Sequence, residues 1–314
     1  MATNNYTTKT AALRATKADI NKLDAKRMLL NGKNIEELWG LNLPDDYKKF
    51  ITRCELPEDE NWAIWDDNGN LLYMNFSDKI INGSYMFYGC SNLSLFSYDL
   101  SSLTVAERMF QKCSNLSSFT SDLSSLTNGN NMFSTCSNLT TFTSDLSSLT
   151  SGTYMFYSCT NLSSFESDLS SLTVAERMFQ FCSNLSSFES DLSSLTEGTY
   201  MFSGCSNLTT FTSDLTSLSD GSGMFSTCSN LSSFESDLSS LTNGNNMFSG
   251  CILDSNSIEN ILTTIPTLTN AKTLTIGIRE SAASKFAEIT GLTPSTTEQT
   301  VSYKGWNVKV KIND

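Results

Sequence analysis

Residues 136–158 read CSNLTTFTSDLSSLTSGTYMFYS, and the chain repeats this stretch with small changes over about half of its 314 residues. Eight cysteines lie 23 residues apart, and each closes a Met-Phe-x-x-Cys motif: Cys90, Cys113, Cys136, Cys159, Cys182, Cys205, Cys228 and Cys251. A fixed period of this length is typical of a solenoid, in which each coil buries its apolar edge only against neighbouring coils. The repeat therefore predicts an elongated stack of coils and favours a binding surface over an enzyme.

Apolar residues occupy seven fixed positions in each unit when the cysteine is counted as position 1. Leucine stands at positions 4, 11 and 14, phenylalanine at 7, and Met-Phe at 20 and 21. An aspartate stands at position 10, and small polar residues fill most of the remaining positions. This pattern predicts a coil with an apolar interior and a polar exterior.

The unit resembles the 23-residue leucine-rich repeats of the BspA-like, or Treponema-type, family. Cys90-x-x-Leu93-x-x-Phe96, followed by Met109-Phe110 before the next cysteine, matches the frame of that family. The resemblance covers residues 81–256 and implies an α/β repeat solenoid built from short parallel strands. The chain departs from the family at position 9, which is mostly serine, whereas the family has an aliphatic residue at position 8 or 9. The closing segment Lys304–Val308 resembles the ends of phage and bacterial proteins that carry such repeats, and the chain overall resembles repeat proteins of gut bacteriophages.

The sequence predicts four segments. Residues 1–40 form a helical attachment or oligomerisation segment, residues 41–85 a cap with a hairpin, residues 86–256 the leucine-rich repeat solenoid, and residues 257–314 a C-terminal cap. Caps are expected because the ends of a solenoid expose apolar surface.

Turn and periodicity signals predict the elements of the two caps. Trp62–Trp65 and Leu71–Met74, joined across Asp-Asn-Gly, predict the hairpin. In the C-terminal cap we expect helices at Ser257–Leu262 and Glu280–Ile289, and strands at Thr273–Ile278 and Trp306–Ile312.

Residues 8–30 predict a helix with one narrow apolar seam, formed by Leu13, Ile20, Leu23 and Leu30. Thr16 and Arg27 interrupt this seam, so it is too thin to fold alone. It packs either on the cap of its own solenoid or against copies in an oligomer, as a short coiled coil would. The intermolecular alternative is slightly favoured and predicts a homo-oligomer.

The net charge of −13 is unevenly distributed. Residues 1–30 carry six Lys/Arg against two Asp, whereas residues 86–251 carry three Lys/Arg against fourteen Asp/Glu. An acidic solenoid argues against nucleic-acid binding, because neutralising phosphates requires Lys and Arg. The basic segment is either a solvated helix face or a surface that docks on an acidic partner.

No stretch of the sequence approaches the ~20 apolar residues of a membrane helix, so we expect no membrane insertion. The first ten residues also lack the apolar core of a secretion signal.

The chain contains no histidine, which excludes Ser-His-Asp and Cys-His catalysis and His-based zinc sites. It has no Gly-rich phosphate loop, and cysteines 23 residues apart lack the short paired spacing of zinc knuckles. We therefore expect no enzymatic activity, no cofactor and no metal site. Their position in an apolar column predicts reduced, buried thiols.

The position-10 aspartates should form a ladder along one edge: Asp99, Asp122, Asp145, Asp168, Asp191, Asp214 and Asp237. Like charges so arranged repel unless they are hydrogen-bonded or bridged by cations. Capping of the following turn by the carboxylate is the simpler alternative, and calcium bridging is the other.

The residues that vary between units indicate where a ligand would bind. Exposed aromatic and charged side chains suit contact with a protein or a glycan. The candidate contact residues are Tyr154, Tyr200, Arg108, Arg177, Glu166, Glu189 and Glu235. Solvent-facing positions also vary without any functional cause.

Together these features lead to the hypothesis of a non-enzymatic bacteriophage virion protein, a fibre or decoration on head or tail that is assembled in the host cytoplasm. Residues 1–40 would bind other virion proteins or copies of the same chain, and the repeats would contact a host surface protein or glycan. The alternative is a bacterial cell-surface adhesin or protein-interaction module. The virion hypothesis rests largely on resemblance and on the missing export signal.

Overall fold

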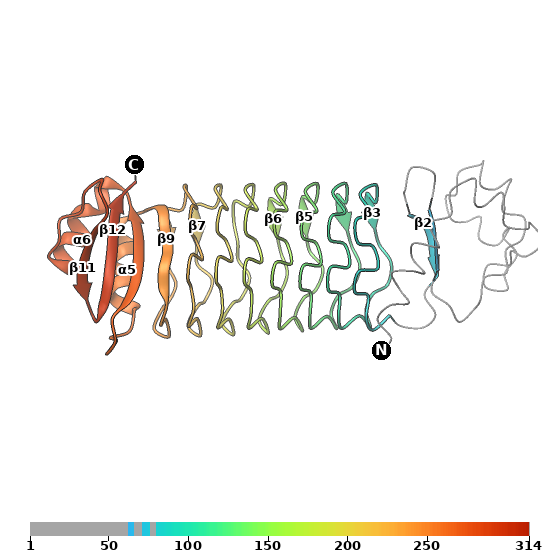
Figure 1. Ribbon diagram of the computed structural model, residues 1–314, viewed down its shortest axis with the longest axis horizontal. Coiled ribbons are helices and arrows are strands. Elements are labelled where there is room, and N and C mark those ends of the chain that lie inside the picture. The colour runs from blue at the N-terminus through green and yellow to red at the C-terminus, as the bar shows by residue number, and fades with distance from the viewer. Residues whose placement is uncertain (1–61, 66–70, 76–79, 314) are drawn as a thin grey trace, which may run out of the picture.

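The computed structural model describes residues 62–65, 71–75 and 80–313. The predicted leader, with its seam Leu13, Ile20, Leu23 and Leu30, and most of residues 41–85 lie outside the described residues. β1 (Trp62–Trp65) pairs antiparallel with β2 (Leu71–Asn75), which confirms the predicted hairpin. Figure 1 shows the repeats as a straight stack of similar coils that ends in a compact C-terminal cap.

Short parallel strands join the coils at positions 6 and 7 of the repeat. Named in chain order, they are β3 (Leu95–Phe96), β4 (Ser118–Phe119), β5 (Thr141–Phe142), β6 (Ser164–Phe165), β7 (Thr210–Phe211) and β8 (Ser233–Phe234). β3 pairs with β4, β5 with β6 and β7 with β8, and each residue faces the residue 23 positions later. The structure thus confirms the predicted solenoid of short parallel strands.

A second ladder of backbone hydrogen bonds runs along positions 17 to 23. In the coil that carries Tyr154, the amides of Gly152, Tyr154, Phe156 and Ser158 donate to carbonyls of the next coil at 2.8–3.0 Å. The amides of Met155 and Tyr157 lie between them and donate within their own coil, to Gly152 and Tyr154. Successive amides therefore donate alternately to the next coil and to their own coil. This satisfies backbone groups that would otherwise be buried without partners.

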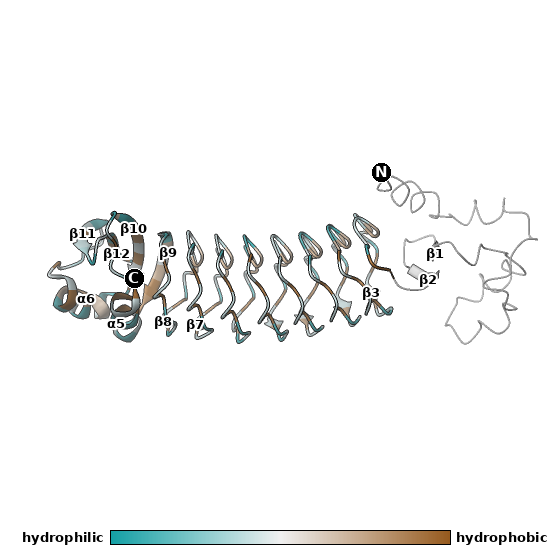
Figure 2. Cartoon of the chain, turned by 90° about the horizontal axis from the view of Figure 1, so that it is seen from below, coloured by the Kyte–Doolittle hydropathy of each residue, from teal (hydrophilic) through white to brown (hydrophobic). Residues whose placement is uncertain are grey.

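The core consists of the seven predicted apolar columns, and in the central coils these side chains are almost completely buried. Two phenylalanine columns, at positions 7 and 21, interlock along the stack. Phe156 stacks on Phe179 with centroids 5.4 Å apart and planes 1° apart, and Phe142 meets Phe156 edge-on at 4.8 Å. Both arrangements suit the quadrupole of the aromatic ring. In Figure 2 the outer bends of the coils are largely hydrophilic or neutral.

The aspartate ladder caps turns, as the simpler alternative predicted. The Oδ1 atom of Asp145 accepts the amide of Ser147 at 2.8 Å, and the other six position-10 aspartates accept the corresponding amide at 2.6–2.9 Å. Next to this turn, the Thr150 hydroxyl donates to the carbonyl of Thr127 in the preceding coil at 3.0 Å. Polar side chains therefore complete the backbone bonding of each coil.

The C-terminal cap continues the last coil as a sheet with strand order β11-β12-β10-β9. β9 (Gly244–Leu253) pairs in parallel with β10 (Lys272–Ile278), β10 pairs in parallel with β12 (Trp306–Ile312), and β11 (Gln299–Tyr303) is antiparallel to β12. β10 thus pairs with the exposed edge of the last repeat.

Two helices accompany this sheet: α5 (Ser255–Thr264) and α6 (Ala283–Thr290), the latter preceded by the 3₁₀ turn η1 (Glu280–Ala282). The predicted helices and strands of this region are confirmed, except that the second helix begins as the 3₁₀ turn. β11 was not predicted, because Gln299–Tyr303 carries only one aliphatic side chain, Val301.

The eight repeat cysteines are buried thiols and form no disulfides, as predicted. Each thiol from Cys113 to Cys251 donates to the carbonyl of the phenylalanine 26 residues earlier, at 3.1–3.2 Å. Burial raises the pKa of Cys159 and of Cys228 to about 12. The thiols therefore act as small core residues and not as nucleophiles.

Raising the pH above about 9 should destabilise the folded chain, because the unfolded chain ionises its thiols near pH 8.5 whereas Cys159 keeps its proton to about 12. This contribution is fully present below pH ~8.5 and is lost as the pH rises towards 12. Each such thiol contributes a decline of up to ~1.4 kcal/mol per pH unit. The urea midpoint of the full-length chain, measured across this range, should fall more steeply than that of Cys159→Ala. An equal pH dependence of the urea midpoint in the two proteins would contradict the raised pKa of Cys159.

Candidate contact surface

Three of the predicted contact residues form one stack. Tyr154, Arg177 and Tyr200 occupy position 19 in consecutive coils, and the Arg177 Cζ atom lies 5.3 Å from the ring centroid of each tyrosine. The Arg177 Nη1 atom donates to the Tyr154 hydroxyl, and the same nitrogen lies 3.0 Å from the Glu176 carboxylate. The guanidinium is thus held between two aromatic faces by cation–π attraction and by an ion pair.

The charge state of Arg177 is fixed by the same contacts. Burial acts to lower its pKa, but the hydrogen bond with Tyr154 and the nearby Glu176 outweigh burial, so that the pKa of Arg177 is raised. The arginine remains charged within the stack.

Two further aromatic residues extend the stack, and the sequence analysis missed both. Tyr157 lies 5.5 Å from Tyr154 and 5.7 Å from Phe181, measured between ring centroids. Phe181 is 44% exposed, although it is a large apolar side chain. Aromatic residues at positions 22 and 23 depart from the polar or glycine residues of most other units, and this departure could have identified them. We call Tyr154, Tyr157, Arg177, Phe181 and Tyr200 the aromatic cluster.

Four of the five residues of the aromatic cluster, all except Tyr157, have a left-handed backbone. Tyr154, Arg177, Phe181 and Tyr200 have φ values of 56°, 54°, 63° and 55°. Such conformations are unfavourable for bulky residues, but the inter-coil ladder holds them in place through the bond from the Tyr154 amide to the Glu176 carbonyl at 2.8 Å and its equivalents. The side chains therefore project from a backbone that is hydrogen-bonded to both the preceding and the following coil.

Two glycines make room for the rings. A Cβ atom at Gly204 would lie 2.6 Å from Cδ1 of Phe181, and one at Gly223 would lie 2.3 Å from Cε1 of Tyr200. Both distances are too short for real contacts. Each ring therefore lies across the backbone of the next coil, where only glycine permits it.

Arg108 belongs to a separate site three coils away. Its Cζ atom lies 5.4 Å from the ring of Tyr85, to whose hydroxyl it donates, and Lys112 Nζ lies 5.3 Å from the ring of Tyr88. The sequence analysis also missed Tyr85, Tyr88 and Lys112. The structure does not bring Arg108 together with Arg177.

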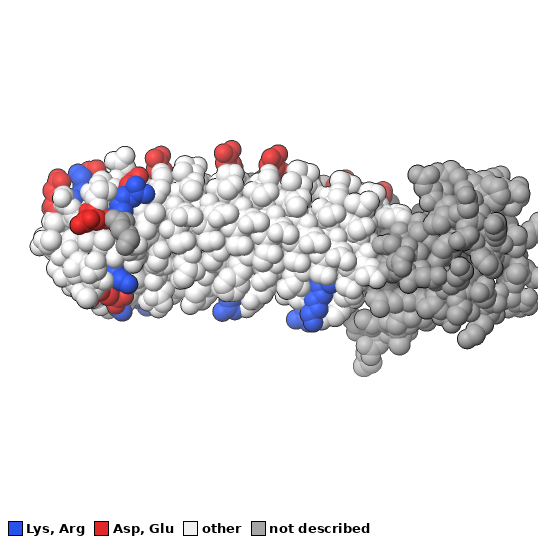
Figure 3. Space-filling view, turned by 90° about the horizontal axis from the view of Figure 1, so that it is seen from above, with Lys and Arg blue, Asp and Glu red and all other residues white. Residues whose placement is uncertain are grey.

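Glu166, Glu189 and Glu235 are exposed at position 8 of their coils, beside the aspartate ladder. Figure 3 shows Asp and Glu gathered along one long edge of the solenoid, with Lys and Arg along the opposite edge. The predicted contact residues therefore divide between two edges, an acidic one and one that carries the aromatic cluster.

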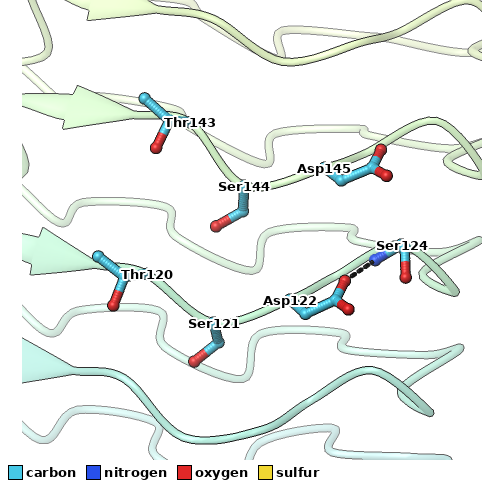
Figure 4. Close-up of a pocket in the computed structure, with 7 residues that line it drawn as sticks. All are labelled: Thr120, Ser121, Asp122, Ser124, Thr143, Ser144 and Asp145. Atoms are coloured by element: carbon cyan, nitrogen blue, oxygen red, sulfur yellow. Dashed lines mark hydrogen bonds between the residues drawn. The ribbon is translucent and has the colours of Figure 1, made fainter.

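The acidic edge contains a shallow hollow of about 480 Å³ between two coils. Thr120, Ser121, Asp122 and Ser124 line it from one coil, and Thr143, Ser144 and Asp145 from the next (Figure 4). The sequence showed serine at position 9, next to the aspartates, but gave no sign that Ser121 and Ser144 line a hollow.

Across 62–65, 71–75 and 80–313, no group of three or more Cys, Asp or Glu side chains is arranged to hold a metal ion. Within the same residues, none of the helices has both the length and the apolar character that a membrane span requires.

Replacing Gly223 with alanine should displace the Tyr200 ring and lower stability by about 1–2 kcal/mol, because a Cβ would overlap the ring and φ is +62°. Gly89→Ala is the matched control, since its φ is +70° but nothing lies within 4 Å of an added Cβ. Thermal unfolding and the near-UV circular dichroism of tyrosine would report both effects. If the two variants changed the tyrosine signal equally, the proposed overlap would be wrong.

The chain matches the family described as BspA type Leucine rich repeat region, in six copies, over residues 66–185 and 150–276. These two ranges together span more than half of the chain. No curated protein and no solved structure is significantly similar to it. The 23-residue period, the parallel inter-coil strands and this match lead to one conclusion: the chain belongs to the BspA-type leucine-rich repeat family, whose repeats form a protein-interaction module.

Proposed function

We propose that this chain is a non-enzymatic structural protein of a bacteriophage particle, in which the solenoid presents the aromatic cluster to a host surface. The observation that carries the contact role is the stack of Tyr154, Arg177 and Tyr200 on a surface otherwise rich in serine and threonine. Tyrosine and arginine are the residue types most enriched among those that dominate binding energy at protein interfaces.

The cluster is suited to binding because it is already ordered before a partner arrives. The left-handed backbone, the Arg177–Glu176 ion pair and the packing of the guanidinium between the rings of Tyr154 and Tyr200 restrict its side chains. Ordering flexible side chains on binding is costly, and a surface that is rigid in advance avoids that cost. Phe181 adds exposed apolar area beside the phenol groups.

The chemistry of the cluster favours a protein partner. Aromatic faces bury apolar side chains, while the tyrosine hydroxyls and the guanidinium satisfy polar groups at the rim. A glycan could also stack on the same rings, so the binding experiment is designed to separate the two.

The placement on a virion is supported by sequence. The resemblance to repeat proteins of gut bacteriophages is an expectation from the sequence alone, and residues 1–30 are basic whereas the solenoid is acidic. In this proposal residues 1–40 bind other particle proteins or copies of the same chain, and the solenoid projects outward. A bacterial cell-surface adhesin is the alternative, and it would use the same cluster.

Arg177→Ala and Tyr200→Ala should each weaken adhesion of the full-length protein to host cells by about 30-fold, the effect of an interface hot spot. Arg108→Ala is the matched control, because it removes the same side chain from the same repeat position three coils away. The measurement is retention of fluorescently labelled protein on intact cells across a panel of gut bacteria. Protease treatment of the cells should abolish binding, whereas loss after periodate treatment alone would identify a glycan. Equal losses in Arg108→Ala and Arg177→Ala would reject the cluster.

The particle role predicts that the chain co-purifies with virions. Peptide mass spectrometry of density-gradient-purified particles should detect it at a fixed ratio to the capsid protein. Its recovery from the surface of cells that release no particles would favour the adhesin alternative instead.

A further inference from the structure

The acidic edge carries ten carboxylates that have no ion pair with any Lys or Arg among the described residues. They are the seven position-10 aspartates and Glu166, Glu189 and Glu235. The coils that bear them are closely spaced, as shown by the 5.9 Å between the ring centroids of Phe119 and Phe142. Like charges at this spacing repel one another, and no Lys or Arg of residues 62–65, 71–75 and 80–313 forms an ion pair that would offset the repulsion.

Asp122 and Asp145 keep one carboxylate oxygen each for a ligand. Oδ1 of Asp122 accepts the amide of Ser124 at 2.8 Å, and Oδ1 of Asp145 accepts the amide of Ser147 at 2.8 Å. No described residue donates to the second oxygen of either carboxylate. The turns therefore fix both carboxylates at the border of the same hollow and leave the second oxygens available.

Ser144 provides an independent sign of a ligand in that hollow, whereas the oxygen of Ser121 points away from the coil that carries Ser144 (Figure 4). The side chains of Ser121 and Ser144 are 3% and 8% exposed, both line the hollow, and neither Oγ atom has a hydrogen-bond partner. Figure 4 shows the Ser144 oxygen pointing from its own coil towards the coil that carries Thr120 and Ser121. A buried hydroxyl without a partner is unfavourable. A bound cation, coordinated by the lone pair of the hydroxyl oxygen, would reduce this cost.

The donor set consists of oxygen atoms alone, which selects a hard cation. Calcium binds oxygen at about 2.3–2.6 Å and tolerates irregular geometry, so two oxygens on opposite sides of it lie about 5 Å apart. That separation is close to the 5.9 Å between the ring centroids of Phe119 and Phe142, which belong to the same two coils. Magnesium requires a near-ideal octahedron at shorter distances and fits this open hollow less well.

We propose that the hollow between Asp122 and Asp145 binds a divalent cation of the calcium class, with the two carboxylates as its charged ligands. Hydroxyl groups of the hollow and water complete the coordination. Only two carboxylates contribute, so the affinity falls in the weak class of about 10⁻⁴–10⁻³ M that is typical of extracellular calcium modules. This site is separate from the aromatic cluster and does not depend on the proposed contact role.

The test is equilibrium dialysis of the full-length protein against radioactive calcium at ~1 mM, in the range of the expected affinity. The variant Asp122→Asn/Asp145→Asn removes both charges but keeps both turns, because an asparagine oxygen can accept the same amide. Glu197→Gln is the matched control, since it removes an exposed charge from position 16 of the solenoid, away from the hollow.

We expect the double variant to lose bound calcium and the calcium-induced rise of its unfolding midpoint, while Glu197→Gln keeps both. Binding should persist in ~0.15 M NaCl, in which a diffuse counterion atmosphere is largely screened. Equal calcium binding by the wild type and the double variant, or its complete loss in this salt, would overturn the proposal. If the double variant does not fold, Ser144→Ala provides the second test, with an expected severalfold weakening of calcium binding.

Discussion

The stacking of phenylalanine between coils is the interaction on which the rest of the structure depends. A single coil contains only two strand residues and a series of turns, so it cannot bury its own apolar side chains. The columns at positions 7 and 21 interlock, with Phe165 meeting Phe179 edge-on at 4.8 Å and stacking on Phe188 at 5.8 Å. This contact repeats along the stack and fixes the spacing at which every backbone ladder forms.

Because the interior is filled in the same way in every unit, the exterior can differ from coil to coil. Position 19 has a left-handed backbone in each described unit, whether it carries Asn131, Tyr154 or Gly223. The fold therefore accepts a large side chain there without rearrangement, provided that the next coil leaves space. Gly204 and Gly223 leave that space for Phe181 and Tyr200. The aromatic cluster and the acidic hollow are thus local variations on a constant framework, placed on opposite edges.

Much of the fold could be predicted from the repeat, because the same position in successive units carries the same residue type and lies in the same surroundings. The buried cysteines, the paired strands and the turn-capping aspartates all followed from position alone. The second ladder, along positions 17 to 23, was not predicted. Its amides donate alternately to the next coil and to their own coil, and its sequence resembles neither a helix nor a strand. β11 was missed for a related reason, since its side chains are mostly polar.

The sequence by itself determined the period, the apolar columns and therefore the solenoid, since a 23-residue repeat of buried side chains has few other ways to exclude water. It also identified Tyr154, Tyr200 and Arg177 as unusual. Only the tertiary structure decided that these three residues stack together, that Arg108 does not join them, and that Glu166, Glu189 and Glu235 are exposed beside the aspartate ladder. The physical reason is that residues 23 apart become neighbours only when the coils stack. The edge on which a side chain lies depends on the path of the backbone, and contacts between coils determine that path.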